Sequence, residues 1–242
     1  MGASRPLMLP PPTRTAPPAT IASPSTLDIE SVNMEINPDD LPWQSIYKIM
    51  IGSIVPRPIG WISTLDVDGL PNLAPFSFFN AVCPNPPHVV FCPMIRGSDT
   101  SHKDTLRNVK NTGEFVVNVV TEPLAEAMNL TSTELPLGIN EFEVAGLVAE
   151  PSRVVRPPRV AASPVHYECR LAHILEFGDQ PGSGAAVIGR VVHLHVSDAV
   201  LIGEDKIDLA SLKPVGRLAG SAYCRVTDVF EMIRPPSQIR SG

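Results

Sequence analysis

The sequence predicts a mainly β protein, a β-barrel with a few flanking helices. Short segments rich in β-branched and aromatic residues alternate with turn residues: a strand over 59–65, a turn over 66–69 and a second strand region over 73–80. Two longer strands are predicted over 164–177 and 185–196. Repeated strands with few helical segments between them are typical of a barrel.

Further strands and a first helix follow in order. Prolines break the chain over 84–87, and the apolar run 88–93 has the length of a buried strand. A helix is predicted over 105–111, because Gly113 stands where a C-cap glycine belongs. The next strand is predicted over 114–120.

A second helix is predicted over 124–130. Thr121 offers a hydroxyl cap, Glu122 an acid in the first turn, and Pro123 an early proline. The glycine-rich segment 178–184 is expected to be an exposed loop between the two long strands.

Composition limits the class of function. The 242 residues, 43% of them hydrophobic, suffice for one domain with extensions and a sizeable core. The net charge of −6 argues against a nucleic-acid-binding face, and no apolar run approaches the roughly 20 residues of a membrane span. Four scattered cysteines without a CxxC pair are typical of reduced thiols in a cytoplasmic protein.

The N-terminus differs from the rest in composition. Residues 1–25 are rich in Pro, Ala, Ser and Thr, and no acidic residue precedes Asp28. Such a segment with Arg5 and Arg14 raises the question of a transit peptide, but its prolines oppose the amphipathic helix that this signal needs. We expect a flexible Pro-rich arm over 1–40 and one domain over 41–242.

The segment RGSDTSHKDT, residues 96–105, is a candidate anion site at the start of the predicted helix. The first N–H groups of a helix lack internal partners and carry a partial positive charge, which Ser and Thr hydroxyls and Lys103 would supplement. The alternative is that Ser101 and Asp104 form a capping box and bind nothing. Spacing alone favours the capping box.

The segment APFSFFN, residues 74–80, is a second candidate. A strand interrupted by Pro75 leaves backbone groups unpaired, and a flat, half-polar ring needs such groups beside an apolar surface. The alternative is that its phenylalanines enter the core. The alternation of side chains along a strand does not carry across a proline. It therefore does not decide which phenylalanine enters the core and which would contact a ring.

Histidines offer a possible metal site on the two long strands. His193 and His195 share one strand face, opposite Val192, Leu194 and Val196, and His166 and Cys169 lie on the neighbouring strand. Imidazoles at this spacing bind zinc or transition metals, but no further ligand has supporting spacing. We therefore predict no metal site.

Other catalytic patterns are absent from the sequence. There is no G-x-S-x-G elbow, no Ser/His/Asp order and no P-loop, which removes support for hydrolase and NTPase functions. There is also no G-x-G-x-x-G at a strand–helix junction, so a nicotinamide nucleotide would not bind in Rossmann fashion.

Four segments together resemble the flavin reductase-like family, whose members bind FMN on a split β-barrel. They are PRPIGWIST (56–64), LAPFSFFN (73–80), SHKDT (101–105) and KPVGRLAGSAY (213–223). In the last, Ala219 replaces the first glycine of the family's R-L-G-G-x-x-Y pattern. The resemblance covers roughly residues 41–235 and is sharpest to flavoredoxin-like proteins and the small components of two-component monooxygenases.

The resemblance implies roles for named residues. The implied cofactor-binding residues are Pro75, Phe76, Ser77, Asn80, Ser101, Lys103, Thr105 and Arg57, of which Ser101, Lys103 and Thr105 would hold the phosphate, with Arg96 and Arg107 as helpers. Arg217 and Tyr223 would line the substrate cleft, or else belong to a structural cap of the barrel. Arg57 is equally compatible with a surface residue fixed between two prolines. No residue is implied as a general acid or base, because hydride transfer belongs to the cofactor.

The resemblance also implies an activity. The expected function is an NAD(P)H-dependent FMN reductase, using NADH or NADPH, that supplies reduced FMN to a partner monooxygenase and forms a homodimer. Two alternatives need the same flavin cradle. The FMN stays bound and reduces a small substrate, or the protein is a flavoredoxin-type electron carrier.

Overall fold

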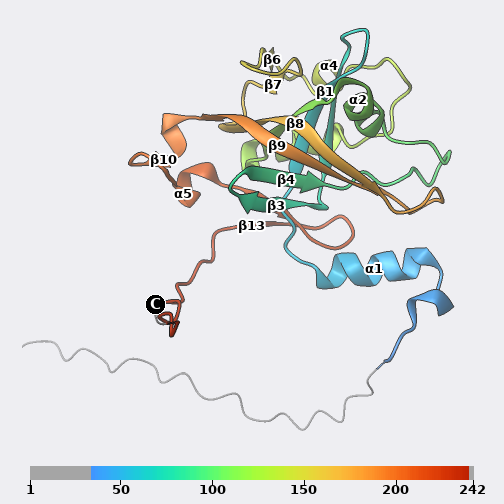
Figure 1. The fold of residues 1–242 in the computed structure, drawn as a ribbon, viewed down its shortest axis with the longest axis horizontal. Coiled ribbons are helices and arrows are strands. Elements are labelled where there is room, and N and C mark those ends of the chain that lie inside the picture. Colours follow the sequence, from blue (N-terminus) through green and yellow to red (C-terminus); the bar gives the residue numbers. More distant parts are fainter. Residues whose placement is uncertain (1–33, 240–242) are drawn as a thin grey trace, which may run out of the picture. The chain divides into compact units, whose positions relative to one another are not determined.

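A seven-stranded antiparallel sheet forms the body of the computed structural model, which describes residues 34–239 (Figure 1). Its strands are β1 (Gly60–Leu65), β2 (Pro71–Phe76), β3 (Phe79–Pro84), β4 (Pro87–Phe91), β5 (Glu114–Val119), β8 (Val165–Glu176) and β9 (Ala185–Val196). Their order across the sheet is β2-β1-β5-β8-β9-β4-β3. The predicted mainly β fold class is confirmed.

The two edge strands of this sheet are consecutive in the chain. Only Ser77 and Phe78 separate β2 from β3, so the edges are tied together and the sheet must curl toward a barrel. The strand region predicted over 73–80 is divided at Ser77 and Phe78 rather than at Pro75, which lies within β2. β2 pairs with β1 while β3 pairs with β4, and one straight strand cannot serve both partners.

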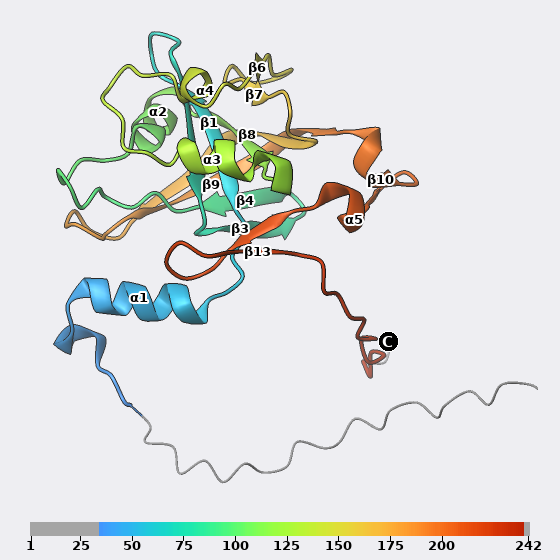
Figure 2. The same cartoon turned by 180° about the vertical axis from the view of Figure 1, so that it is seen from behind.

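The core lies on both faces of β1, whose successive side chains point in opposite directions. Ile62 packs inside the barrel with Phe91 and Phe115, whereas Trp61 belongs to a second cluster outside it. There the Trp61 indole donates to Thr131 Oγ1 at 2.9 Å, beside helix α3 (Ala125–Leu130), which Figure 2 shows in front of the sheet.

Both predicted helices are present. Helix α2 (Asp104–Thr112) ends at Gly113, whose φ of 71° is the left-handed C-cap conformation that glycine favours. Before α3, the short helix η2 (Glu122–Leu124) forms, but the Thr121 side chain makes no capping hydrogen bond, so the predicted hydroxyl cap is wrong. The other short helices are η1 (Pro38–Asp40), η3 (Asp198–Val200), α4 (Glu141–Val144) and α5 (Leu209–Leu212).

Helix α1 (Trp43–Ser53) was not predicted, although its spacing signals it. Trp43, Ile46, Tyr47, Met50 and Ile51 follow the i, i+3, i+4, i+7, i+8 pattern of an amphipathic helix. Reading this stretch as the start of the β region missed that period.

Three two-stranded ladders complete the fold. They pair β6 (Ala149–Glu150) with β7 (Arg159–Val160), β10 (Leu201–Ile202) with β11 (Lys206–Ile207), and β12 (Val215–Arg217) with β13 (Tyr223–Arg225). Among residues 34–239, no helix combines the length and apolar character that a membrane crossing requires. The arm predicted over 1–40 lies mostly outside the described residues, and a compact unit begins at Pro38.

Candidate functional site

A cavity opens at the bend between β2 and β3. Its lining includes these predicted site residues: Arg57, Pro75, Phe76, Ser77, Lys103, Arg217 and Tyr223. The bend, the start of α2 and the β12–β13 ladder each supply part of the wall. The topology thus gathers segments that are far apart in the sequence.

Lys103 is the cation of this cavity. It stands at the N-cap of α2, and its ammonium lies 5.7 Å from the centre of the Phe76 ring. Within residues 34–239 the ammonium forms no ion pair or hydrogen bond. Burial lowers the pKa of Lys103, an effect that nearby Glu134 opposes and Arg96 reinforces. A desolvated ammonium at a helix N-terminus is suited to receive an anion.

A smaller, more polar cavity adjoins the first, and Pro75, Lys103 and Ser132 line both. It also includes Arg96, and hydroxyls of Thr131 and Thr133. The acidic residues of its wall are Asp104, Glu134 and Glu141. Lys103 therefore stands where the larger cavity, lined in part by Phe76, Phe78 and Met128, meets the smaller one.

The acidic groups of the polar cavity are already engaged. Asp104 forms ion pairs with Arg96 at 3.3 Å and Arg107 at 2.7 Å. Glu141 Oε2 accepts the Leu73 N–H at 3.0 Å, and burial raises the pKa of this carboxyl. Ser98 donates to Glu134 at 2.8 Å. None of these carboxylates forms an ion pair with Lys103, although Glu134 lies near enough to favour its charge.

The capping box is wrong. The Ser101 hydroxyl donates to Asp99 at 2.7 Å and accepts from Arg96 at 3.3 Å, and it makes no cap bond to α2. Since Asp104 pairs with arginines instead, neither member of the box satisfies the helix N-terminus. Ser101 lines neither of the two cavities.

Thr105 and Asn80 lie apart from the larger cavity. Thr105 is buried, and its hydroxyl accepts from Asn72 Nδ2 at 2.9 Å, although the residue does line the polar cavity. Asn80 is exposed on β3, where its side chain accepts from the Ala81 N–H at 2.8 Å.

Arg57 is buried, with 5% of its surface exposed, so a surface residue held between prolines is excluded. Its guanidinium donates to the carbonyls of Ile51 at 2.8 Å, Ile54 at 2.7 Å and Leu218 at 2.9 Å. Its Nε donates to Ser77 Oγ at 3.3 Å. Burial lowers the pKa of Arg57, with Tyr47 opposing the shift and Arg217 adding to it. Arg57 thus ties α1 and the β12 end to the cavity.

The three phenylalanines of the bend have separate places. Phe76 is buried against Phe91, with ring centres 5.1 Å apart, and it also lines the cavity. Phe79 packs against the core and fills the space above Gly60, where a Cβ would lie 2.6 Å from its ring. Phe78 lines the cavity, tilted toward Tyr47 at 6.5 Å.

Arg217 and Tyr223 face each other across the β12–β13 ladder. The Arg217 guanidinium lies 4.5 Å from the centre of the Tyr223 ring and donates to its hydroxyl and to the Gly220 carbonyl. The Tyr223 hydroxyl in turn donates to Asn129 at 3.3 Å. This pair forms one wall of the cavity.

Sequence reasoning missed several lining residues: Tyr47, Ile51, Cys92, Met94, Met128 and Ser132. The helical period of α1 could have found Tyr47 and Ile51. The others lie at the ends of strands or helices that only the fold brings together, and no local pattern marks them.

The sequence matches a known protein family. Residues 51–205 match the flavin reductase like domain family. The uncharacterized protein BH2278 of Halalkalibacterium halodurans is 41% identical over 204 residues, which cover 84% of this chain and 97% of that protein.

Solved structures are similar over most of the chain. Nitrilotriacetate monooxygenase component B from Bacillus cereus has a TM-score of 0.78 at 35% identity, covering 84% of this chain and all of that one. The 2-nitrobenzoate 2-nitroreductase NbaA of Pseudomonas fluorescens has a TM-score of 0.75 at 32% sequence identity. The match covers 85% of this chain and 100% of that one. A split-barrel protein of Shewanella frigidimarina has a TM-score of 0.71 at 21% sequence identity, and the match covers 84% of this chain and 100% of that one. This likeness confirms the predicted split barrel as the fold. The chain therefore belongs to the flavin reductase-like family and is a flavin-related oxidoreductase.

Proposed function

We propose that the protein binds FMN and reduces it with NADH or NADPH, supplying reduced FMN to a partner monooxygenase. The observation that carries the proposal is Lys103, a half-buried cation without an ion pair among residues 34–239, at the place where the larger cavity, lined in part by aromatic side chains, adjoins the smaller one. A flavin mononucleotide has the matching order of parts, since its flat ring and its phosphate lie at opposite ends.

The residues present fit this cofactor. Pro75, Ser77 and Phe78 would support the ring, and Lys103, with Arg96 and Ser132, would hold the phosphate. When bound, the flavin supplies the hydride-accepting ring. The chain's own task is to orient that ring and leave one face accessible.

Two relatives support different uses of the same site. The 35% identity to a monooxygenase component B supports the supply of reduced flavin to an oxygenase. The 32% identity to a nitroreductase supports the second candidate, in which FMN stays bound and a small substrate is reduced.

Stopped-flow oxidation of NADH and NADPH, with and without free FMN, tests the proposal. We expect rapid oxidation that accelerates with added FMN, followed by release of the reduced flavin. Rapid oxidation with retained flavin would instead establish the second candidate. Absence of reaction with both nucleotides would overturn reductase activity and favour an electron carrier.

We further propose that the protein is a homodimer whose cofactor cleft is completed by the second copy. The cavity encloses about 210 Å³, less than the roughly 300–1,000 Å³ of small-molecule sites. Beside it, α1 exposes Trp43, Ile49 and Met50 to solvent, and Ile54 is exposed at its C-cap. Apolar side chains grouped on one helix indicate a contact surface, and C2 pairing is the commonest oligomer symmetry.

Light scattering is expected to give twice the 26.0 kDa chain mass. Ile49→Glu should shift the protein toward monomer and weaken FMN binding, because a charge on the contact surface opposes its burial. Lys48→Glu on the solvent side of α1 is the matched control. A monomer that still holds FMN tightly would contradict a shared cleft.

Tyr223→Ala should change the steady-state constants for nicotinamide while FMN affinity stays within a few-fold. Tyr223 lies with Arg217 in one cavity wall and, unlike Lys103, does not line the smaller cavity that would take the phosphate. Removing the ring opens that wall and frees the Arg217 guanidinium.

Steady-state kinetics and FMN titration of the same variant check this prediction, with Tyr167→Phe, on β8, as the control. Loss of FMN binding would place Tyr223 in the cofactor cradle. Unchanged kinetics would leave the β12–β13 ladder as a structural cap only.

A further inference from the structure

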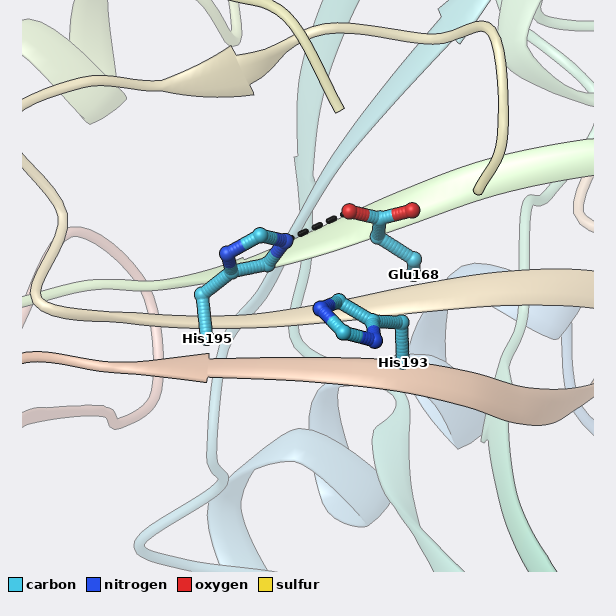
Figure 3. A group of neighbouring side chains, drawn as sticks. All are labelled: Glu168, His193 and His195. Carbon is cyan, nitrogen blue, oxygen red and sulfur yellow. Dashed lines mark hydrogen bonds and ion pairs between the residues drawn. The ribbon is translucent and has the colours of Figure 1, made fainter. Parts of the chain in front are cut away.

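Three side chains on the β8–β9 pair converge outside the cavity (Figure 3). Glu168 on β8 is the cross-strand partner of His193 on β9, and His195 follows two residues later on the same face. A carboxylate oxygen and one nitrogen of each imidazole all lie within 4.8 Å of one another. None of the three lines the larger or the polar cavity.

Glu168 supplies the ligand that sequence spacing did not reveal. It shares a strand face with His166, whereas Cys169 is buried in the barrel core and cannot join the histidines. The Glu168 carboxylate is fully buried and accepts from His195 Nε2 at 2.5 Å. It also accepts the N–H groups of three consecutive residues, Arg153 at 2.7 Å, Val154 at 2.7 Å and Val155 at 3.1 Å. These donors fix its orientation, as outer-shell partners do for metal-binding carboxylates.

His193 is the accessible member of the cluster. Its ring is 4.7 Å from that of His195, and no group of residues 34–239 hydrogen-bonds to it. Both of its nitrogens are thus available to a ligand. Being half-buried, the ring can turn without disturbing the core.

A second observation shows an unused electron pair beside the cluster. His166 is buried opposite His195 across the strands, and its Nε2 donates to the Val160 carbonyl at 2.9 Å. The proton is therefore on Nε2, and Nδ1 is an acceptor. That Nδ1 is buried with no hydrogen-bond partner in the described chain. Buried acceptors normally have a partner, so a donor is expected beside this nitrogen, although His166 is not one of the three residues whose ligand atoms lie within 4.8 Å of one another.

We propose that Glu168, His193 and His195 form a zinc site that holds the segment 153–155 to the outer face of the barrel. Two imidazoles and a carboxylate are ligands that Zn²⁺ takes at about 2.0–2.2 Å. In tetrahedral geometry such ligand atoms lie roughly 3.4 Å apart. Closing the site therefore requires His193 to turn toward the carboxylate and His195 Nε2 to move away from Glu168 Oε1, from which it is now 2.5 Å. The metal would take the place of the proton between His195 Nε2 and Glu168. Because the three ligands do not line the cavity, the role is structural, and it does not depend on the flavin chemistry.

Calorimetric titration of chelator-treated, flavin-containing protein with ZnCl₂ tests the proposal. We expect one Zn²⁺ per chain and a melting temperature that rises by about 5–10 °C at roughly a hundred times the Kd. The variant His193→Ala should lower the affinity by roughly a hundredfold or more, because outer-shell partners alone contribute 10–100-fold. Its circular dichroism and flavin content should be those of the unmodified protein.

His173→Ala is the matched control, since His173 is an exposed histidine of β8 outside the cluster. It should leave both the stoichiometry and the affinity unchanged. Glu168→Gln is a second variant, and it should abolish the rise in melting temperature even where it lowers the starting value. The proposal is overturned by an absence of saturable Zn²⁺ binding, or by equal effects of His193→Ala and His173→Ala.

Discussion

Replacing Lys103 with alanine is expected to weaken FMN binding more than about tenfold while riboflavin binding changes little. A charge-assisted hydrogen bond contributes about 1.5–3 kcal/mol, and only FMN carries the phosphate that would receive it. Because no described side chain forms an ion pair with Lys103, its removal leaves no carboxylate unpaired. The loss should therefore appear in phosphate binding rather than in stability. Fluorescence titration with the two flavins gives the ratio directly.

Lys110→Ala is the control, since Lys110 lies on the same helix but pairs with Glu176 at the surface. It should leave both affinities unchanged. Equal weakening of FMN and riboflavin by Lys103→Ala would show that the phosphate lies elsewhere.

The same lysine gives the preference for FMN a pH dependence. Burial lowers the pKa of Lys103, so its positive charge is lost at a lower pH than that of an exposed lysine. The charged form is the one that binds phosphate. The ratio of FMN to riboflavin affinity should therefore fall as the pH rises through the lowered pKa. Titrations from about pH 7 to about pH 10 cover that interval.

Most of the fold could be predicted from local pattern because its strands are long or sharply bounded. The strands predicted over 164–177 and 185–196 appear as β8 and β9 with bounds within a residue or so, since a glycine-rich loop separates two β-branched runs. The helix ending at Gly113 was readable for a similar reason. The bend at Ser77 and Phe78 was not, because only the pairing of β2 and β3 with different partners reveals it.

The candidate site was predictable where one short segment contributes both shape and charge. Residues 75–77 and Lys103 line the cavity because the bend and the start of α2 meet there. Ser101 and Thr105 flank Lys103 in sequence, yet one bonds to Asp99 and the other to Asn72. Side-chain direction at a helix start is set by tertiary neighbours, which spacing does not record. Glu168 escaped notice for the same reason, since its histidine partners are on another strand.

Replacing Arg57 with methionine is expected to lower the free energy of unfolding by about 3 kcal/mol or more. Methionine keeps much of the apolar length but removes the donors to the carbonyls of Ile51, Ile54 and Leu218. Each hydrogen bond from a charged donor is worth about 1.5–3 kcal/mol, and an acceptor left buried without a partner adds a cost. Two of these hydrogen bonds are partly exposed to solvent, so the expected loss of unfolding free energy lies toward the lower end of the summed range. The melting temperature should fall by about 6–12 °C for a domain of this size.

The exposed Arg190 of β9 provides the control, and Arg190→Met should change the melting temperature by no more than a degree or two, as surface substitutions do. The melting temperature of Arg57→Lys should lie between those of Arg57→Met and Arg190→Met. An ammonium cannot reach all four acceptors that the planar guanidinium bonds. FMN affinity, measured well below the melting temperature, shows whether Arg57 stabilises the fold around the cavity or contacts FMN itself. Four of the five N–H groups of Arg57 are already used within the chain, so we expect stability to fall far more than FMN affinity. A stable Arg57→Met variant that has lost FMN would contradict this expectation. It would show that Arg57 binds the cofactor rather than holding α1, Ser77 and Leu218 together.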